Sequence, residues 1–255
     1  MYYKIRNDIL FRQYKEYGYI TDNSEYGYQF LNSNRKNPGE NYISESGAVM
    51  LAALGKTPRD IDEIITELMQ IFQGVDFDTL KTDTIEFYQW LLDQGYLSCG
   101  DTYESCVDTN RAASIEDTEQ KNGIAVVSAD ECEKNVINSN DFLRSIHFDI
   151  TSICNERCVH CYIPHKEKTR AIDSALFYRI IEDGRKQNII HVTLSGGEPL
   201  LHPDFISFLA RCRELDLSVN VLTNLISLTD EMISEMKKNP LLSVQTSIYS
   251  MDPEV

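Results

Sequence analysis

The 255-residue chain contains no run of about 18 or more consecutive apolar residues, so the sequence predicts no membrane-spanning helix. Residues 1–20 also lack the apolar core of a secretory signal peptide. From these two absences we expect a cytoplasmic protein with no membrane partner.

Basic residues are scarce. The chain has 24 Lys and Arg against 40 Asp and Glu, which gives a formal net charge of −16. A broad nucleic-acid surface needs clustered Lys and Arg to bind phosphates, so the composition argues against a nucleic-acid partner. The charge favours a cationic partner such as a Lys-rich peptide, although a generally acidic cytosolic proteome explains it equally well.

Seven cysteines in a cytosolic chain indicate metal ligands or free thiols rather than disulfides. Cys99, Cys106 and Cys132 lack metal-ligand spacing, and the sequence assigns them no role. Cys212 shares a helical face with apolar residues, which predicts a buried thiol.

The remaining three cysteines, Cys154, Cys158 and Cys161, have the spacing C-x3-C-x2-C. Three thiolates on one short loop can hold three irons of a [4Fe-4S] cluster and leave the fourth iron open to a substrate or cofactor. The alternatives are a zinc site with a distant fourth ligand and three unrelated thiols.

A second motif, Gly196-Gly197-Glu198-Pro199, begins 35 residues (196 − 161) after the last of these cysteines. Together the two motifs resemble the signature of the radical S-adenosylmethionine (SAM) superfamily. The resemblance implies that the cysteines ligate a [4Fe-4S] cluster and that Gly196 to Pro199 bind the methionine end of SAM.

The resemblance also implies weaker assignments. His160 occupies the position of an aromatic residue near the adenine of SAM, or is a solvent-facing loop residue. Thr223 and Asn224 resemble the end of the third barrel strand near SAM, or form a simple turn. Ser247 bonds a ribose hydroxyl, or is an ordinary polar residue at a strand end. No catalytic residue is expected beyond the cluster and SAM ligands.

In this family the reduced cluster cleaves SAM to a 5′-deoxyadenosyl radical, which abstracts a hydrogen atom from the substrate. An electron donor such as flavodoxin or ferredoxin is therefore an expected partner.

Strands and helices alternate through residues 143–255, which predicts a parallel α/β sheet. Chemistry in such folds lies on the loops after the strands, where both motifs fall. The resemblance implies a partial (β/α) radical SAM barrel. Only four strands precede the end of the sequence, so we expect a truncated barrel, the N-terminal part of a longer SPASM-type enzyme, that does not sustain turnover alone. The expected strands are 146–150, 189–194, 218–222 and 242–248, and the expected helices are 173–186, 203–215 and 229–238.

Residues 1–97 predict a small winged-helix-like α+β domain. The expected strands cover residues 10–20, 26–31 and 41–43. The expected helices begin after the N-caps Ser44 and Thr57 and cover residues 80–94, ending at Gly95.

This pattern resembles the peptide-binding domain called the RiPP recognition element. The resemblance implies a precursor-peptide leader as partner, added as a strand to the edge of residues 41–43. Tyr42 and Tyr88 line the peptide pocket or belong to the core. A generic winged helix that binds DNA is the alternative, and the acidic balance counts against it.

Residues 98–142 hold ten acidic and three basic residues and predict an acidic linker. The leading interpretation is a radical SAM enzyme that cross-links a ribosomally made peptide. The alternatives are a radical SAM enzyme with another substrate and an inactive, truncated peptide-binding protein.

Overall fold

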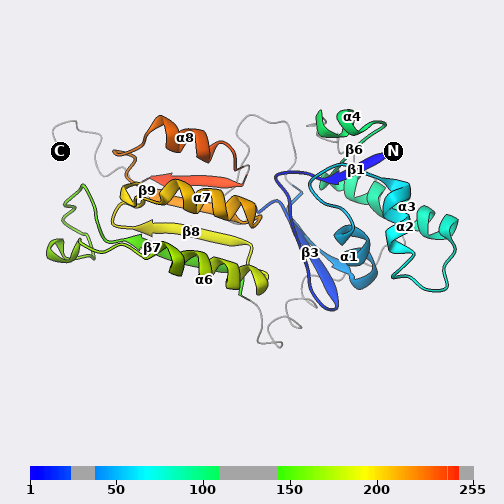
Figure 1. Ribbon diagram of the computed structural model, residues 1–255, viewed down its shortest axis with the longest axis horizontal. Coiled ribbons are helices and arrows are strands. Elements are labelled where there is room, and N and C mark those ends of the chain that lie inside the picture. The colour runs from blue at the N-terminus through cyan, green and yellow to red at the C-terminus, as the bar shows by residue number, and fades with distance from the viewer. Residues whose placement is uncertain (24–37, 109–142, 240, 247–255) are drawn as a thin grey trace. The chain divides into compact units, whose positions relative to one another are not determined.

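A computed structural model describes residues 1–23, 38–108, 143–239 and 241–246 of the chain (Figure 1). The chain divides into two compact units, Met1–Asn138 and Ser139–Val255. Within the described residues, no helix combines the length and apolar character needed to cross a membrane.

In its described residues, the first unit holds two antiparallel three-stranded sheets, ordered β5-β1-β6 and β2-β3-β4, and four α-helices. The strands are β1 (Tyr2–Ile5), β2 (Leu10–Gln13), β3 (Tyr17–Thr21), β4 (Glu40–Ser44), β5 (Arg59–Asp60) and β6 (Leu97–Gly100). The helices are α1 (Glu45–Ala52), α2 (Ile61–Leu68), α3 (Phe77–Gln94) and α4 (Tyr103–Asp108).

The single strand predicted over residues 10–20 is wrong. The chain turns between β2 and β3, where the Tyr14 N–H donates to the Tyr17 carbonyl at 2.8 Å. The prediction for residues 41–43 is confirmed within β4. The strand predicted over residues 26–31 lies outside the described residues. The central strand β1 was not expected at all.

Two of the predicted helix boundaries are confirmed. The Ser44 hydroxyl accepts a hydrogen bond from the Gly47 N–H at the start of α1, and Gly95 ends α3 with a left-handed φ of 91°. The predicted N-cap Thr57 is wrong, because residues 59 and 60 pair with β1 as β5. Helix α2 therefore begins only at Ile61, with Asp60 as its N-cap.

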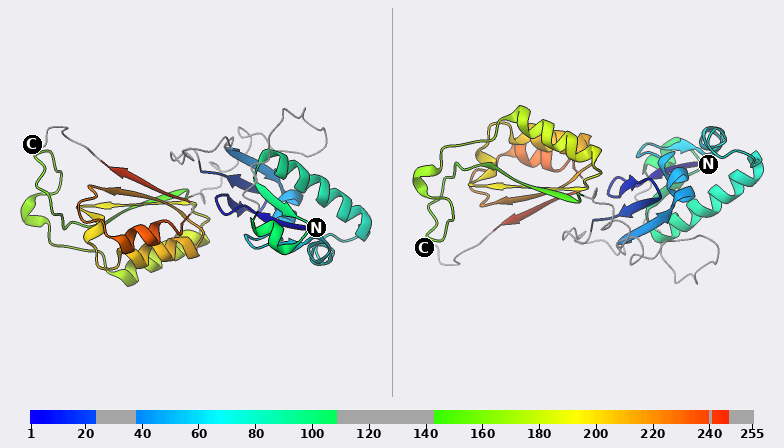
Figure 2. Two further views of the ribbon diagram at one scale, coloured as in Figure 1. Left: turned by 90° about the horizontal axis from the view of Figure 1, so that it is seen from above. Right: turned by 90° about the horizontal axis from the view of Figure 1, so that it is seen from below.

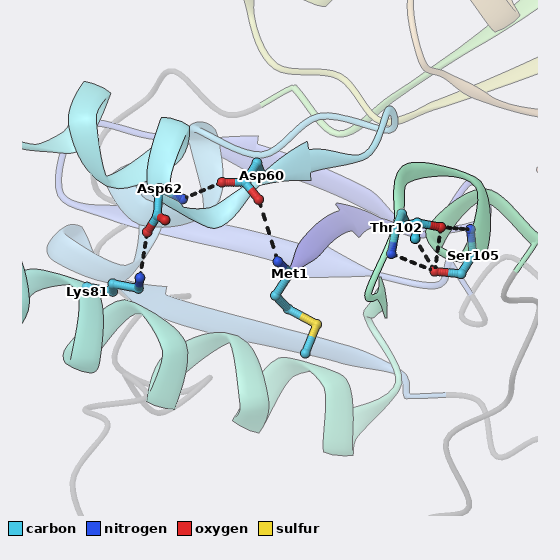
Figure 3. Close-up of polar contacts among 6 residues, drawn as sticks. All are labelled: Met1, Asp60, Asp62, Lys81, Thr102 and Ser105. Carbon is cyan, nitrogen blue, oxygen red and sulfur yellow. Dashed lines mark hydrogen bonds and ion pairs between the residues drawn. The ribbon is translucent and has the colours of Figure 1, made fainter.

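Asp60 joins three parts of the first unit (Figure 3). One carboxylate oxygen accepts from the Asp62 N–H at 2.9 Å, and the other lies 3.5 Å from the Met1 amino group. Asp62 in turn forms an ion pair of 2.6 Å with Lys81, which links α2 to α3.

The first unit extends beyond the predicted boundary at residue 97. Strand β6 pairs with β1 along its whole length. Thr102 and Ser105 then exchange hydrogen bonds that start α4 (Figure 3). The side chain of Cys106 is buried in α4. Residues 98–108 thus belong to the packed unit, and the rest of the predicted linker lies outside the described residues.

The second unit is a parallel four-stranded sheet of order β10-β9-β8-β7. Helices α6, α7 and α8 all lie on one face of the sheet (Figure 2). This confirms the predicted strand–helix alternation, with boundaries shifted by at most two residues. The elements are β7 (Ser145–Thr151), α6 (Ser174–Lys186), β8 (His191–Gly196), α7 (Phe205–Glu214), β9 (Ser218–Thr223), α8 (Asp230–Met236) and β10 (Leu242–Thr246), with the short 3-10 helices η2 (His165–Glu167) and η3 (Pro199–Leu201).

The core of the second unit lies between the sheet and the helices. Phe177 of α6 stacks on Phe208 of α7 with ring centroids 3.9 Å apart. Cys212 is fully buried beside them, as predicted, and burial raises the pKa of its thiol to about 12. This apolar layer stabilises the packing of the helices on the sheet, and the loops extend from the ends of the strands.

Candidate active site

Three loops meet at the carboxyl ends of neighbouring strands. The cysteine loop, residues 152–170, follows β7; the Gly-Gly-Glu-Pro segment follows β8; and Thr223 and Asn224 end β9. Backbone and side-chain hydrogen bonds join all three loops, as described below. The structure therefore brings the two sequence motifs together at one edge of the sheet.

Ser152 closes the neck of the cysteine loop. Its hydroxyl donates to the Glu167 carbonyl at 2.9 Å and accepts from the N–H groups of Thr169 and Arg170. Within the loop, the Lys168 ammonium donates to the Glu156 carbonyl at 2.7 Å. The loop is thus held at its base and across its middle.

Cys154, Cys158 and Cys161 are half-buried free thiols on this loop. The Cys154 sulfur accepts from the Glu156 N–H at 3.4 Å, and the Cys161 N–H donates to the Cys158 carbonyl at 3.1 Å. Among the described residues, no three His, Cys, Asp or Glu side chains are gathered as a bound metal would require. The donor set itself, three accessible thiols within eight residues, fits an iron–sulfur cluster. His160 is exposed on the same loop.

Gly196 and Gly197 pack against the entry of the cysteine loop. A Cβ on Gly196 would lie 2.2 Å from the Thr151 carbonyl oxygen, and Gly196 has a φ of 132°. A Cβ on Gly197 would lie 2.4 Å from the Ile153 carbonyl oxygen. The Gly197 and Glu198 N–H groups donate to these two carbonyls, at 2.6 and 2.8 Å. Contact between the loops is therefore one physical reason for the glycine pair.

Glu198 is buried and joins the second loop to the third. Its Oε1 accepts from the Thr223 hydroxyl at 2.6 Å and from the Leu200 N–H at 3.1 Å. Its Oε2 accepts from the Asn224 N–H at 2.8 Å. Pro199 is buried at the start of η3. The Glu198 side chain thus stabilises the loops directly, in addition to the turn that the sequence assigned to it.

Thr223 and Asn224 do form a turn, and they also contact both other loops. The Thr223 oxygen accepts from the Leu225 N–H, while the Asn224 side-chain amide donates to Asn155 Oδ1 at 2.8 Å. Asn155 belongs to the cysteine loop, so Asn224 connects all three loops. Ser247 lies outside the described residues, and its assignment stays a prediction.

The face of the sheet opposite the helices is polar. Strand side chains alternate between faces, and the residues between the buried apolar ones point away from the helices. The Ser243 hydroxyl of β10 donates to Asn220 Oδ1 of β9 at 3.0 Å on this face. The polar side chains of this face include His147, Asp149, Thr193, Ser195, Asn220 and Ser243.

Asp149 connects this polar face to the cysteine loop. Its carboxylate accepts from the Tyr162 hydroxyl at 3.1 Å and lies 3.6 Å from His147 Nε2. Asp149 and Tyr162 also line a pocket of about 500 Å³ between β7 and residues 162–172. The pocket therefore joins the polar face of the sheet to the cysteine loop.

The sequence interpretation missed Ser152, Asn155 and Asp149. The alternation of polar and apolar residues along β7 was a usable signal for Asp149. No local pattern distinguishes Ser152 or Asn155 from other polar loop residues, because their partners are distant in the sequence.

A family model described as the radical SAM superfamily matches residues 148–255. This range covers the cysteine loop, the Gly-Gly-Glu-Pro segment and the end of β9. The match agrees with the motifs and with the parallel sheet that carries them.

Curated relatives each match less than half of the chain. A tungsten-containing aldehyde ferredoxin oxidoreductase cofactor-modifying protein of Pyrococcus furiosus is 32% identical over 113 residues, 43% of this chain and 31% of that protein. A PqqA peptide cyclase of Methylocella silvestris is 31% identical over 106 residues, 41% of this chain and 28% of that protein. The chain matches about a third of the length of these relatives.

Among solved structures, Streptococcus suis SuiB resembles the whole chain. The structure of SuiB bound to the precursor peptide SuiA has a TM-score of 0.50, and the structure bound to S-adenosylmethionine has 0.52. Both are 16% identical and cover 99% of this chain but 49% of SuiB. At this identity the likeness concerns the fold alone.

The three cysteines, the Gly-Gly-Glu-Pro segment beside them and the one-sided parallel sheet agree with the family match. The second unit therefore has an α/β partial radical SAM fold, and residues 148–255 match the radical SAM superfamily model.

Proposed function

We propose that this chain is part of a radical SAM enzyme that modifies a ribosomally made peptide. The observation that carries the proposal is the convergence of the cysteine loop, the Gly-Gly-Glu-Pro segment and the end of β9 through Glu198 and Asn224. These loops surround the edge of the sheet where parallel α/β folds place their chemistry.

The superfamily implies a [4Fe-4S] cluster and SAM as cofactors. Cys154, Cys158 and Cys161 would hold the cluster, and the backbone of Gly196 to Pro199 would hold the methionine end of SAM. The cluster and SAM together supply a radical that abstracts hydrogen. The chain's own part is to hold the three loops in register and to offer the polar face of the sheet to the substrate.

The first unit supports a peptide partner. Within the described residues, β4 pairs with β3 alone and is an edge of its sheet. An edge strand offers unpaired backbone groups to an incoming extended peptide. The names of two relatives point the same way, since one is a PqqA peptide cyclase and SuiB binds a precursor peptide.

Tyr88 does not line a peptide pocket. Its side chain is fully buried, and its hydroxyl donates to the Met50 carbonyl at 2.7 Å. Tyr42 is also buried and packs on Tyr19, with ring centroids 5.2 Å apart. Both residues belong to the interior, so recognition would depend on the β4 backbone rather than on these rings.

A second candidate is a radical SAM enzyme that acts on a substrate other than a peptide. The cofactor-modifying protein of Pyrococcus furiosus favours it, because the name of that relative describes the modification of a cofactor rather than of a peptide. The first unit of this chain would then have a structural role.

Titration of the chain with the leader of a small precursor peptide encoded beside its gene separates the two candidates. We expect saturable binding of the leader and loss of binding when alternate backbone amides of the leader are N-methylated, because methylation removes the donors of a strand ladder. A scrambled leader of the same composition is the control. Equal binding of the scrambled leader, or no binding of either, would contradict the peptide proposal.

A further inference from the structure

Asn155 lies between two of the cysteines, and its side chain bonds to a different loop. Its Oδ1 accepts from the Asn224 amide at 2.8 Å, and its Nδ2 donates to the Ser227 hydroxyl at 3.2 Å. Both partners follow β9. Neither motif nor any of the comparisons assigns a role to Asn155.

The orientation of Asn224 is itself fixed on two sides. Its N–H donates to the buried carboxylate of Glu198 at 2.8 Å, and its Oδ1 accepts from the Ile226 N–H at 3.0 Å. With Oδ1 occupied by a donor, the Nδ2 group must be the one that faces Asn155. Asn155 therefore binds a rigid partner rather than another mobile loop side chain.

The segment around Cys154 is anchored on both sides. Before it, the carbonyls of Thr151 and Ile153 accept from the Gly197 and Glu198 N–H groups. After it, the Asn155 side chain is bonded to the third loop. Cys161 is tied differently, because the hydroxyl of the neighbouring Tyr162 donates to the Asp149 carboxylate of β7 at 3.1 Å rather than to the Gly-Gly-Glu-Pro segment or the third loop.

We infer that Asn155 is a positioning residue that fastens the cysteine loop to the turn after β9 and so fixes Cys154 relative to the Gly-Gly-Glu-Pro segment. Cys154 is then the ligand whose position relative to that segment is set before a cluster binds. Fixing one ligand would lower the conformational entropy lost on cluster binding and would hold that ligand beside the segment expected to bind SAM. This inference rests on the proposed cofactor chemistry, but its geometric part is independent of it.

The first experiment compares amide hydrogen exchange of the metal-free full chain and its Asn155→Ala variant. We expect exchange at residues 152–158 and 224–227 to accelerate about tenfold in the variant, because both bonds to the third loop are lost. Val159→Ala, at a fully exposed position of the same loop, is the matched control and leaves these rates unchanged. Unchanged exchange in Asn155→Ala would overturn the inference, whatever the chain binds.

The second experiment uses the anaerobically reconstituted chain. We expect Asn155→Ala to keep its iron content and its thermal midpoint. We expect its affinity for SAM to be about tenfold weaker than that of the wild-type chain. The affinity is measured from the change in the spectrum of the reduced cluster when SAM is added. Asn224→Ala should also weaken this affinity. The double variant should be no worse than Asn155→Ala, because Asn155→Ala already removes the bond to Asn224 together with the bond to Ser227.

Wild-type SAM affinity in Asn155→Ala, or additive losses in the double variant, would overturn the positioning role. If the wild-type chain takes up no cluster, the cofactor proposal fails, and the exchange experiment alone then decides whether Asn155 fastens the loop.

Discussion

The hydroxyl of Thr223 donates a hydrogen bond of 2.6 Å to the carboxylate of Glu198, and both side chains are buried. Thr223 is the last residue of β9, and Glu198 lies in the loop that follows the neighbouring parallel strand β8. Glu198 accepts two further hydrogen bonds from backbone N–H groups, so all its recorded partners are donors. Both oxygens of the Glu198 carboxylate act as acceptors, and together they join the second loop to the third.

Replacing Glu198 with Gln should therefore destabilise the second unit. A Gln amide turns one acceptor into a donor that faces another donor, at a cost of about 2 kcal/mol in the free energy of unfolding. Urea denaturation measures the change. Glu231→Gln, at an exposed position of α8, is the control and should change stability by less than about 0.5 kcal/mol. Equal effects of the two substitutions would refute the role of Glu198.

Replacing Gly196 or Gly197 with Ala should prevent the second and first loops from packing. The added Cβ would meet backbone carbonyls at 2.2 and 2.4 Å, and backbone cannot yield as a flexible side chain does. We expect a loss of about 3 kcal/mol or more in each variant, measured by thermal unfolding. Gly55→Ala is the control, since a Cβ there meets nothing closer than 3.8 Å. The account fails if Gly197→Ala is as stable as Gly55→Ala.

The stability of the chain should depend on pH through His191. This side chain is buried, with Nδ1 2.9 Å from the Ser218 hydroxyl, and burial lowers its pKa from 6.5 to about 4. The unfolded state binds the proton more readily. The stabilisation is thus fully present above about pH 6.5 and is lost as the pH falls toward 4, by up to about 3 kcal/mol.

Urea denaturation between pH 7 and pH 4 tests this dependence on His191. A His191→Gln variant should lose less stability across that interval than the wild-type chain does, because Gln carries no titrating group. A variant with the same pH slope as the wild type would show that other groups cause the dependence.

The thiols should differ in reactivity in the metal-free chain. Cys154, Cys158 and Cys161 are half-buried on a loop, whereas Cys212 is fully buried with its pKa raised to about 12. Only the thiolate reacts with iodoacetamide, so we expect Cys212 to be labelled at least about a hundredfold more slowly at pH 8. Mass spectrometry of tryptic peptides measures the rates. Labelling of Cys212 as fast as the loop thiols would contradict the packing described for α7.

The parallel sheet and its motifs could be predicted from the sequence because their signals are local. Apolar strands such as β8, amphipathic helices such as α6 and the spacing of Cys154, Cys158 and Cys161 are all readable within short windows. The cofactor class followed from that spacing and from the Gly-Gly-Glu-Pro segment.

Other features depend on distant partners and could not be read in this way. The N-cap of α2 is Asp60 rather than the predicted Thr57, because residues 59 and 60 pair with β1 near the start of the chain. The glycine pair looked like a cofactor cradle, but the structure adds contact with the backbone of residues 151–153 as a reason for it. Asn155 gave no signal, since its partners lie about seventy residues away.

The central claim is that three cysteines on one loop hold an iron–sulfur cluster. The most direct test is the iron and sulfide content of the chain after anaerobic reconstitution, compared with a variant in which Cys154, Cys158 and Cys161 are all Ala. The account predicts about four irons and four sulfides in each wild-type chain and almost none in the variant. The same iron content in both proteins would contradict it.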